Sequence, residues 1–146
     1  MRKIIKFFSF LVWGALGALV VYGIYNATQN VEGDANNVRV LQLENTHHRK
    51  TDMENAVVAV KDYFKKNFFG ARLDEIWYGH DYDKEKELEK QFGGAEVIIL
   101  RSKYMKFTGD EERKWGWIVV KYNEAKMEVQ NWGYDDNEKI DARILN

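Results

Sequence analysis

Cysteine is absent from the 146-residue chain. This absence excludes disulfide bonds, a lipid anchor on an N-terminal cysteine, and every metal site built on thiolates. If the protein is exported, its stability must come from packing alone.

The chain also lacks an excess of positive charge, since its formal net charge is −1. Three of the 22 basic residues, Arg2, Lys3 and Lys6, precede the first apolar run. The rest of the chain therefore has 19 basic and 23 acidic residues, a net charge of −4. Nucleic-acid binding needs a basic patch to face the phosphates. The sequence therefore argues against a nucleic-acid partner.

A long uncharged run occupies the N-terminus, with nineteen residues from Phe7 to Tyr25 carrying no charge. That length is close to the roughly 20 residues that cross a bilayer. Basic residues lie only before the run, which predicts a cytoplasmic N-terminus and a domain outside the cell membrane. We interpret residues 1–26 as an uncleaved, single-pass signal-anchor; cleavage would instead give a secreted protein.

The next segment, residues 27–50, is rich in Asn, Gln and short polar residues. It is typical of a polar tether without a core of its own. Its apolar residues Val38, Val40, Leu41 and Leu43 leave open a short strand or an extension of the first helix.

Residues 51–134 carry the pattern of a folded α+β domain. Thr51-Asp52-Met53-Glu54 matches a capping box, and apolar residues recur at helical spacing as far as Phe68. A strand is predicted over 71–79, and a short helix follows it and ends at Gly93-Gly94. Three further strands, over about 97–105, 114–122 and 126–134, complete the order α-β-α-β-β-β.

This order predicts a long helix packed on a bent four-stranded antiparallel sheet, with a short second helix. Aromatic residues make up 14% of the chain, enough to fill the core of so small a domain. Residues 135–146 are mostly polar, and we interpret them as a C-terminal tail.

Several of these segments together resemble an uncharacterised extracytoplasmic family of Gram-positive, mainly spore-forming bacteria. The segments are ENAVVAVKDYFKKNFFG at 54–70, LDEIWY at 73–78, EVIIL at 96–100, WGWIVV at 115–120 and NWGY at 131–134. The resemblance implies a cystatin-like or nuclear-transport-factor-like cone fold, with a helix cradled by a bent sheet. It implies no activity, and the family's lipoprotein cysteine is missing here.

Aromatic side chains on the predicted strands are the candidate binding residues. An exposed row of such rings could stack on sugars or anchor a protein partner, whereas a buried row would be the core. The candidates are Trp77, Tyr78, Trp115, Trp117, Trp132 and Tyr134.

Acidic residues in or beside the predicted strands could line a cone pocket and act as a general base. They are Glu75, Glu96 and Glu128, and the alternation around Glu128 favours a solvated position. The histidines His47, His48 and His80 show no metal-ligand spacing, although His80 stands near Asp81 and Asp83. We assign no catalytic residue, no metal site and no cofactor.

Three functions remain, in order of preference. The first is non-catalytic binding of a protein or an envelope complex by a membrane-anchored domain. The second is binding of cell-wall saccharide or a small ligand in an aromatic groove or cone pocket. The third is a minor enzyme that uses a pocket carboxylate. Burial of the tryptophans distinguishes the first two, because sugars need a solvent-facing row of rings.

Overall fold

The computed structural model describes residues 15–22, 31–109 and 111–130. The chain divides into two compact units, Met1–Val31 and Glu32–Asn146.

The first unit contains a helix over residues 15–22. The rest of the expected membrane span, 7–14 and 23–25, lies outside the described residues. Within the described ranges, no helix combines the length and the apolar character needed to cross a membrane.

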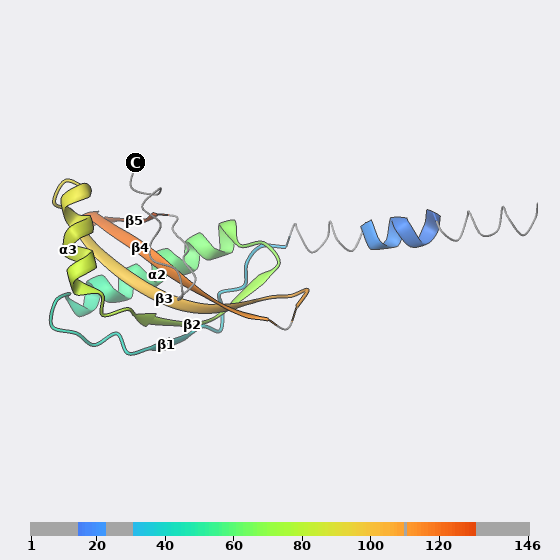
Figure 1. Ribbon diagram of the computed structural model, residues 1–146, viewed down its shortest axis with the longest axis horizontal. Helices are drawn as coiled ribbons and strands as arrows, with labels where there is room; N and C mark the ends of the chain where they lie inside the picture. Colours follow the sequence, from blue (N-terminus) through green and yellow to red (C-terminus); the bar gives the residue numbers. More distant parts are fainter. Residues whose placement is uncertain (1–14, 23–30, 110, 131–146) are drawn as a thin grey trace, which may run out of the picture. The chain divides into compact units, whose positions relative to one another are not determined.

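The second unit is an α+β domain, as predicted (Figure 1). Its elements follow the chain in the order β1 (Arg39–Leu41), α2 (Lys50–Asn67), β2 (Ala71–Tyr78), α3 (Tyr82–Gln91), β3 (Glu96–Lys106), β4 (Glu112–Asn123) and β5 (Lys126–Gln130).

The sheet has five strands in the order β1-β2-β3-β4-β5, so the expected count of four was wrong. The additional strand is β1, which comes from the segment interpreted as a tether. It pairs parallel to β2, whereas the other neighbours are antiparallel. Of the two alternatives left open for the apolar residues at 38–43, the structure shows the short strand. Three residues are too few for side-chain alternation to decide between a strand and a helix in the sequence.

The residues before β1 also belong to the fold. Asp34 forms a parallel bridge with Arg72, and its backbone N–H donates to the carbonyl of Ala71 at 2.9 Å. Ala35 is fully buried. The compact unit that contains the sheet therefore begins at Glu32, earlier than the predicted residue 51.

Helix α2 packs through the predicted face, and Met53, Val57, Val60 and Phe64 are all buried. The predicted capping box was wrong, because the helix begins at Lys50 and its N-cap Arg49 makes no side-chain cap bond. Asp52 is buried instead and faces charged partners.

Strand β2 contains an irregularity between Leu73 and Glu75. A bulge adds a residue to one strand, so the alternation of faces changes phase there. Leu73 and Ile76 are both buried in the same apolar cluster as a result, although strict alternation would place them on opposite faces.

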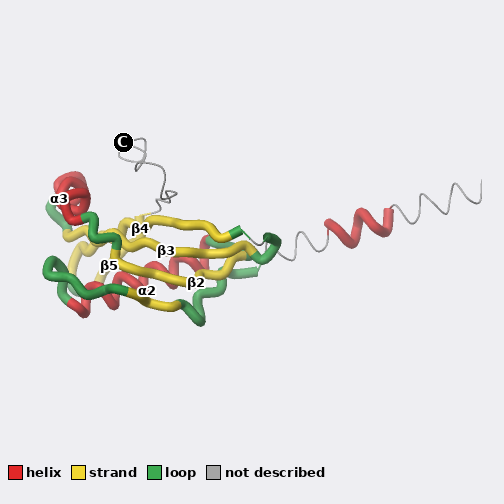
Figure 2. The backbone as a smooth tube through the Cα atoms, turned by 60° about the horizontal axis from the view of Figure 1, so that its bottom comes forward, coloured by secondary structure: helices red, strands yellow, loops and turns green. Residues whose placement is uncertain are grey.

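The sheet lies between two apolar clusters. The larger one joins α2 to one face and includes Phe64, Tyr104 and Trp117. The smaller one lies on the other face at one end, where Leu88 of α3 packs on Val97 and Ile118. Figure 2 shows α2 running along the sheet, while α3 is confined to one end.

A substitution at Gly33 tests whether the domain begins before residue 51. A Cβ atom there would lie 2.5 Å from the Phe64 carbonyl oxygen and 2.9 Å from that of Phe68. Gly33→Ala should therefore lower the free energy of unfolding by about 1–3 kcal/mol, measured by urea titration. Gly109→Ala is the control and should change little, since a Cβ atom there would lie 4.0 Å from the nearest atom, the backbone nitrogen of Glu111. Equal stability of the two variants would contradict an ordered segment at 32–35.

Candidate functional site

A buried polar cluster lies where β2, α3 and β3 meet the loop before α2. We call it the His48 cluster, and it consists of His48, Tyr78, Glu85 and Glu96. His48 Nε2 lies 2.8 Å from Glu85 Oε2, and Nδ1 lies 2.7 Å from Glu96 Oε1. The Glu85 side chain has no exposed surface, and the His48 side chain is 2% exposed.

The Glu85 carboxylate has all its contacts inside the fold. Oε2 also accepts the Tyr78 hydroxyl at 2.9 Å, and Oε1 accepts the backbone N–H of Ile99 at 2.8 Å. Such contacts are needed, because an unpaired buried carboxylate is very unfavourable.

A turn at Asn45 places His48 in the cluster. The Asn45 side-chain oxygen accepts the backbone N–H groups of His47 and His48, at 2.8 and 2.7 Å. Asn readily forms such local turns through its side chain. The imidazole thereby reaches Glu85, which lies 37 positions further along the chain.

A second charged network adjoins the cluster. Lys121 of β4 lies 3.0 Å from Asp52 and 3.9 Å from Glu96. Arg49 binds Asp52 at 2.9 Å and Glu124 at 2.7 Å. Together these contacts connect the N-terminal end of α2 to the sheet.

Contacts to the cluster change two pKa values. Burial opposes the charged imidazolium, but hydrogen bonds to Glu85 and Glu96 outweigh it and raise the pKa of His48 above 6.5. Burial and the bond to Glu85 raise the pKa of Tyr78 far above its usual range. At neutral pH the cluster therefore favours a charged histidine between two acids and a neutral tyrosine.

A pocket of about 220 Å³ opens beside the cluster. Its lining is formed by Leu43, Glu44, Asn45, His48, Lys50, Met53 and Glu54. Both His48 nitrogens and both Glu85 oxygens already have partners within the protein. The arrangement is suited to holding charge and joining elements, rather than to exchanging protons with a substrate.

The six predicted aromatic residues differ in their burial in the structure. Tyr78 and Trp117 are core residues, exposed by 1% and 0%. Trp77 and Trp115 are half-buried, and the Trp115 ring packs on Phe68 at 5.6 Å between ring centroids. Trp132 and Tyr134 lie outside the described residues.

The predicted acids and histidines fall into different surroundings. Glu96 belongs to the His48 cluster, Glu75 pairs with Arg39 on the sheet, and Glu128 pairs with Lys126 at the surface. His80 instead packs beside Tyr78.

The sequence did not predict the hydrogen bond between His48 and Glu85. One signal was available for Glu85, which precedes Leu88 by three positions and so shares the face that α3 buries. His48 carried no comparable signal, because its burial depends on residues far away in the sequence.

Comparisons with known protein families, with curated proteins and with solved structures find no significant match to this chain.

The raised pKa of His48 makes stability depend on pH. The folded pKa exceeds the unfolded value near 6.5, so this contribution is complete below about pH 6.5 and is lost as the pH rises through the folded pKa. Urea unfolding from about pH 6 to about pH 9 should show the decline. His48→Gln should remove it and His47→Gln should retain it; a decline that survives His48→Gln would assign it to another group.

Removal of the Glu85 carboxylate should be strongly destabilising. Glu85→Ala leaves His48 and the Ile99 N–H without their buried acceptor, and should lower the free energy of unfolding by about 3–5 kcal/mol. Glu87→Ala on the same helix removes a surface ion pair with Lys84 and should cost under about 1 kcal/mol. Thermal and urea unfolding measure both, and equal losses would contradict a central position for Glu85.

Proposed function

We propose that this protein is a membrane-anchored extracytoplasmic domain that binds, without catalysis, an extended segment of a protein partner in the bacterial cell envelope. The partner segment adds to the sheet along the outer edge of β1. The observation that carries the proposal is that the outer edge of β1 is open among the described strands.

Strand β1 pairs with β2 on one side, and no described strand pairs with its other side. An open edge presents backbone N–H and C=O groups that a further strand can bind. Addition of a strand to such an edge is a recurrent way of binding peptides, in which neighbouring pockets provide specificity.

The edge also exposes apolar side chains. Val40 and Leu41 are 44% and 41% exposed. An open hollow of about 630 Å³ adjoins them, and we call it the β1 hollow; it is lined by Val40, Gln42, Leu43, Glu44, Lys50 and His80. Exposed apolar groups beside a hollow favour a partner with apolar side chains.

The backbone around this hollow is unusual. Gln42 and His80, with φ angles of 47° and 55°, are the non-glycine residues with positive φ in the described part of the chain. Both line the β1 hollow. This conformation is unfavourable for residues with a Cβ atom, and such residues concentrate at binding sites.

The alternatives have less support. Saccharide binding calls for a solvent-facing row of rings, whereas Trp117 and Tyr78 are core residues. A pocket-carboxylate enzyme calls for an available acid, whereas Glu85 is saturated by internal contacts. The resemblance to the cone-fold family remains part of the proposal, and the packing of α2 on the sheet is compatible with it.

Photo-crosslinking in the source cells tests the binding edge in the full chain. A photoreactive amino acid in place of Leu41 should give a discrete adduct with another protein. The control is the same substitution at Val58, which is 56% exposed on α2 and should not give that adduct. Absence of a position-specific adduct would refute a protein partner at β1. An adduct at twice the mass of the chain would refute a different protein as the partner and would identify a second copy of the chain instead.

A further inference from the structure

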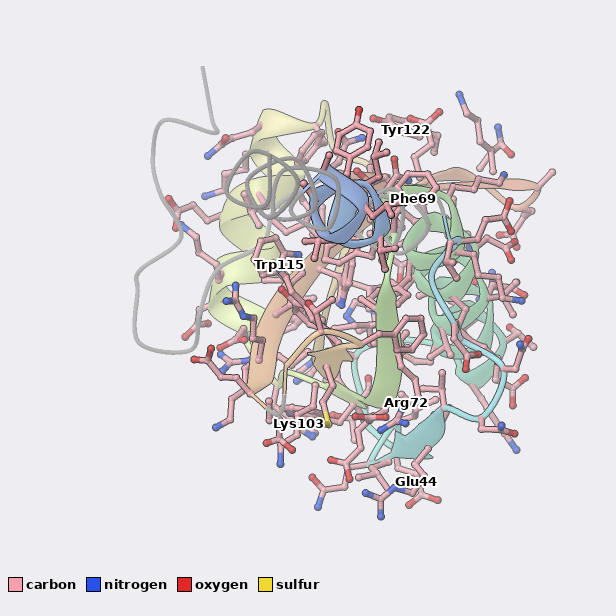
Figure 3. The ribbon with its side chains drawn as sticks, turned by 90° about the vertical axis from the view of Figure 1, so that its right-hand side faces the viewer. Glu44, Phe69, Arg72, Lys103, Trp115 and Tyr122 are labelled. Atoms are coloured by element: carbon pink, nitrogen blue, oxygen red, sulfur yellow. The ribbon has the colours of Figure 1, made fainter. Side chains whose placement is uncertain are left out.

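Two exposed phenylalanines lie at one end of the sheet, remote from the His48 cluster. Phe69 and Phe107 are each 49% exposed. The backbone N–H of Phe107 donates to the carbonyl of Gly70 at 2.8 Å, so the turns that carry both rings are adjacent. Figure 1 shows the α2–β2 and β3–β4 turns at the same end of the sheet, and Figure 3 looks onto that end with Phe69 labelled.

The chain enters the domain at this same end. The Gly33 N–H donates to the Lys65 carbonyl at 3.0 Å, and Gly33 packs so closely on Phe64 and Phe68 that a Cβ atom would clash. The entry point is therefore fixed beside the turn that carries Phe69.

Covalent geometry limits how far this end can lie from the expected anchor. Eight peptide units separate Tyr25, the last residue of the uncharged run, from Gly33, and they span at most about 29 Å. The eleven residues of β3 extend about 36 Å along the sheet, so the far end can lie well beyond that distance.

Lysine side chains lie in the same two segments as the phenylalanines. Segments 65–70 and 106–109 contain Lys65, Lys66 and Lys106 and no acid. Lys66 and Lys106 are exposed and form no ion pair with any described residue. The β3–β4 turn continues into three acids, Asp110, Glu111 and Glu112. Glu111 lies 3.7 Å from Arg113 and Glu112 lies 3.2 Å from Lys103, whereas Glu32 is exposed and Asp110 lies outside the described residues. Pairing of Glu111 and Glu112 with local cations leaves the exposed Lys66 and Lys106 to face an anionic surface.

We propose that the end formed by Phe69, Gly70 and Phe107 docks on the anionic phospholipid surface of the membrane that holds the anchor. The rings enter the interfacial layer, and the lysines face the lipid phosphates. This inference rests on the anchoring included in the proposed function, and it adds a defined orientation of the domain.

The absence of cysteine permits a direct test, because a single introduced cysteine is the only thiol in the full chain. Phe69→Cys and Phe107→Cys are labelled with nitrobenzoxadiazole and reconstituted in phosphatidylcholine vesicles with or without phosphatidylglycerol. Tyr122→Cys is the matched control, an aromatic position 44% exposed near the other end of β4. Unchanged unfolding midpoints establish that the labelled chains are folded.

With phosphatidylglycerol present, emission from labels at 69 and 107 should move to shorter wavelength and be quenched by nitroxide-bearing lipid, unlike the label at 122. Lys106→Ala should lower the ratio of docked to undocked domain roughly fivefold. Labels at 69 and 107 that behave like the label at 122, or docking that does not depend on phosphatidylglycerol, would overturn the inference. Vesicle flotation distinguishes failure of the docking inference from failure of the proposed anchor. A chain that floats without docking retains the anchor and refutes only the docking, whereas a chain that does not float refutes both the anchor and the docking.

Discussion

The Glu85 carboxylate is the interaction on which the fold most depends. It joins α3, through its own backbone, to Ile99 of β3, Tyr78 of β2 and His48 of the loop before α2. A carboxylate with no exposed surface is tolerable only while these donors are in place, because its desolvation must be offset by charged and hydrogen-bonded partners. Loss of one donor therefore weakens the position of every other element in the set.

The two ends of α2 contact the sheet through different kinds of interaction. Its N-terminal end meets the sheet through charge, with Asp52 against Lys121 at 3.0 Å. Its C-terminal end meets the sheet through rings, with the Phe68 centroid 5.3 Å from that of Trp117 and 5.6 Å from that of Trp115. Charged pairs require particular partners, whereas apolar packing tolerates sliding, so the charged end sets the register of the helix on the sheet.

Local patterns in the sequence predicted what local forces determine. The buried face of α2 followed from the spacing of Met53, Val57, Val60 and Phe64, and Gly93-Gly94 marked the end of α3 because both take positive φ. Long-range pairing was not predictable in this way. Asp52 stands inside the predicted capping box Thr51–Glu54, yet its partner Lys121 lies 69 positions away. Likewise, only the register with β2 distinguishes β1 from an extension of the first helix.

Strand β1 is exposed, but the contacts around it hold it in place. The chain leaves β1 at Gln42 and reaches α2 through the turn at Asn45 and the imidazole of His48, which is held by Glu85 and Glu96. An open edge fixed at the connection to the next element loses little conformational freedom when a strand is added, and pre-organisation of this kind strengthens binding. The contacts of His48 with Glu85 and Glu96 thus influence the exposed edge of β1 indirectly. The polar atoms of these side chains are bonded within the protein, and they hold the loop that follows β1, the strand whose Val40 and Leu41 are exposed at the edge to which we propose that a partner strand adds.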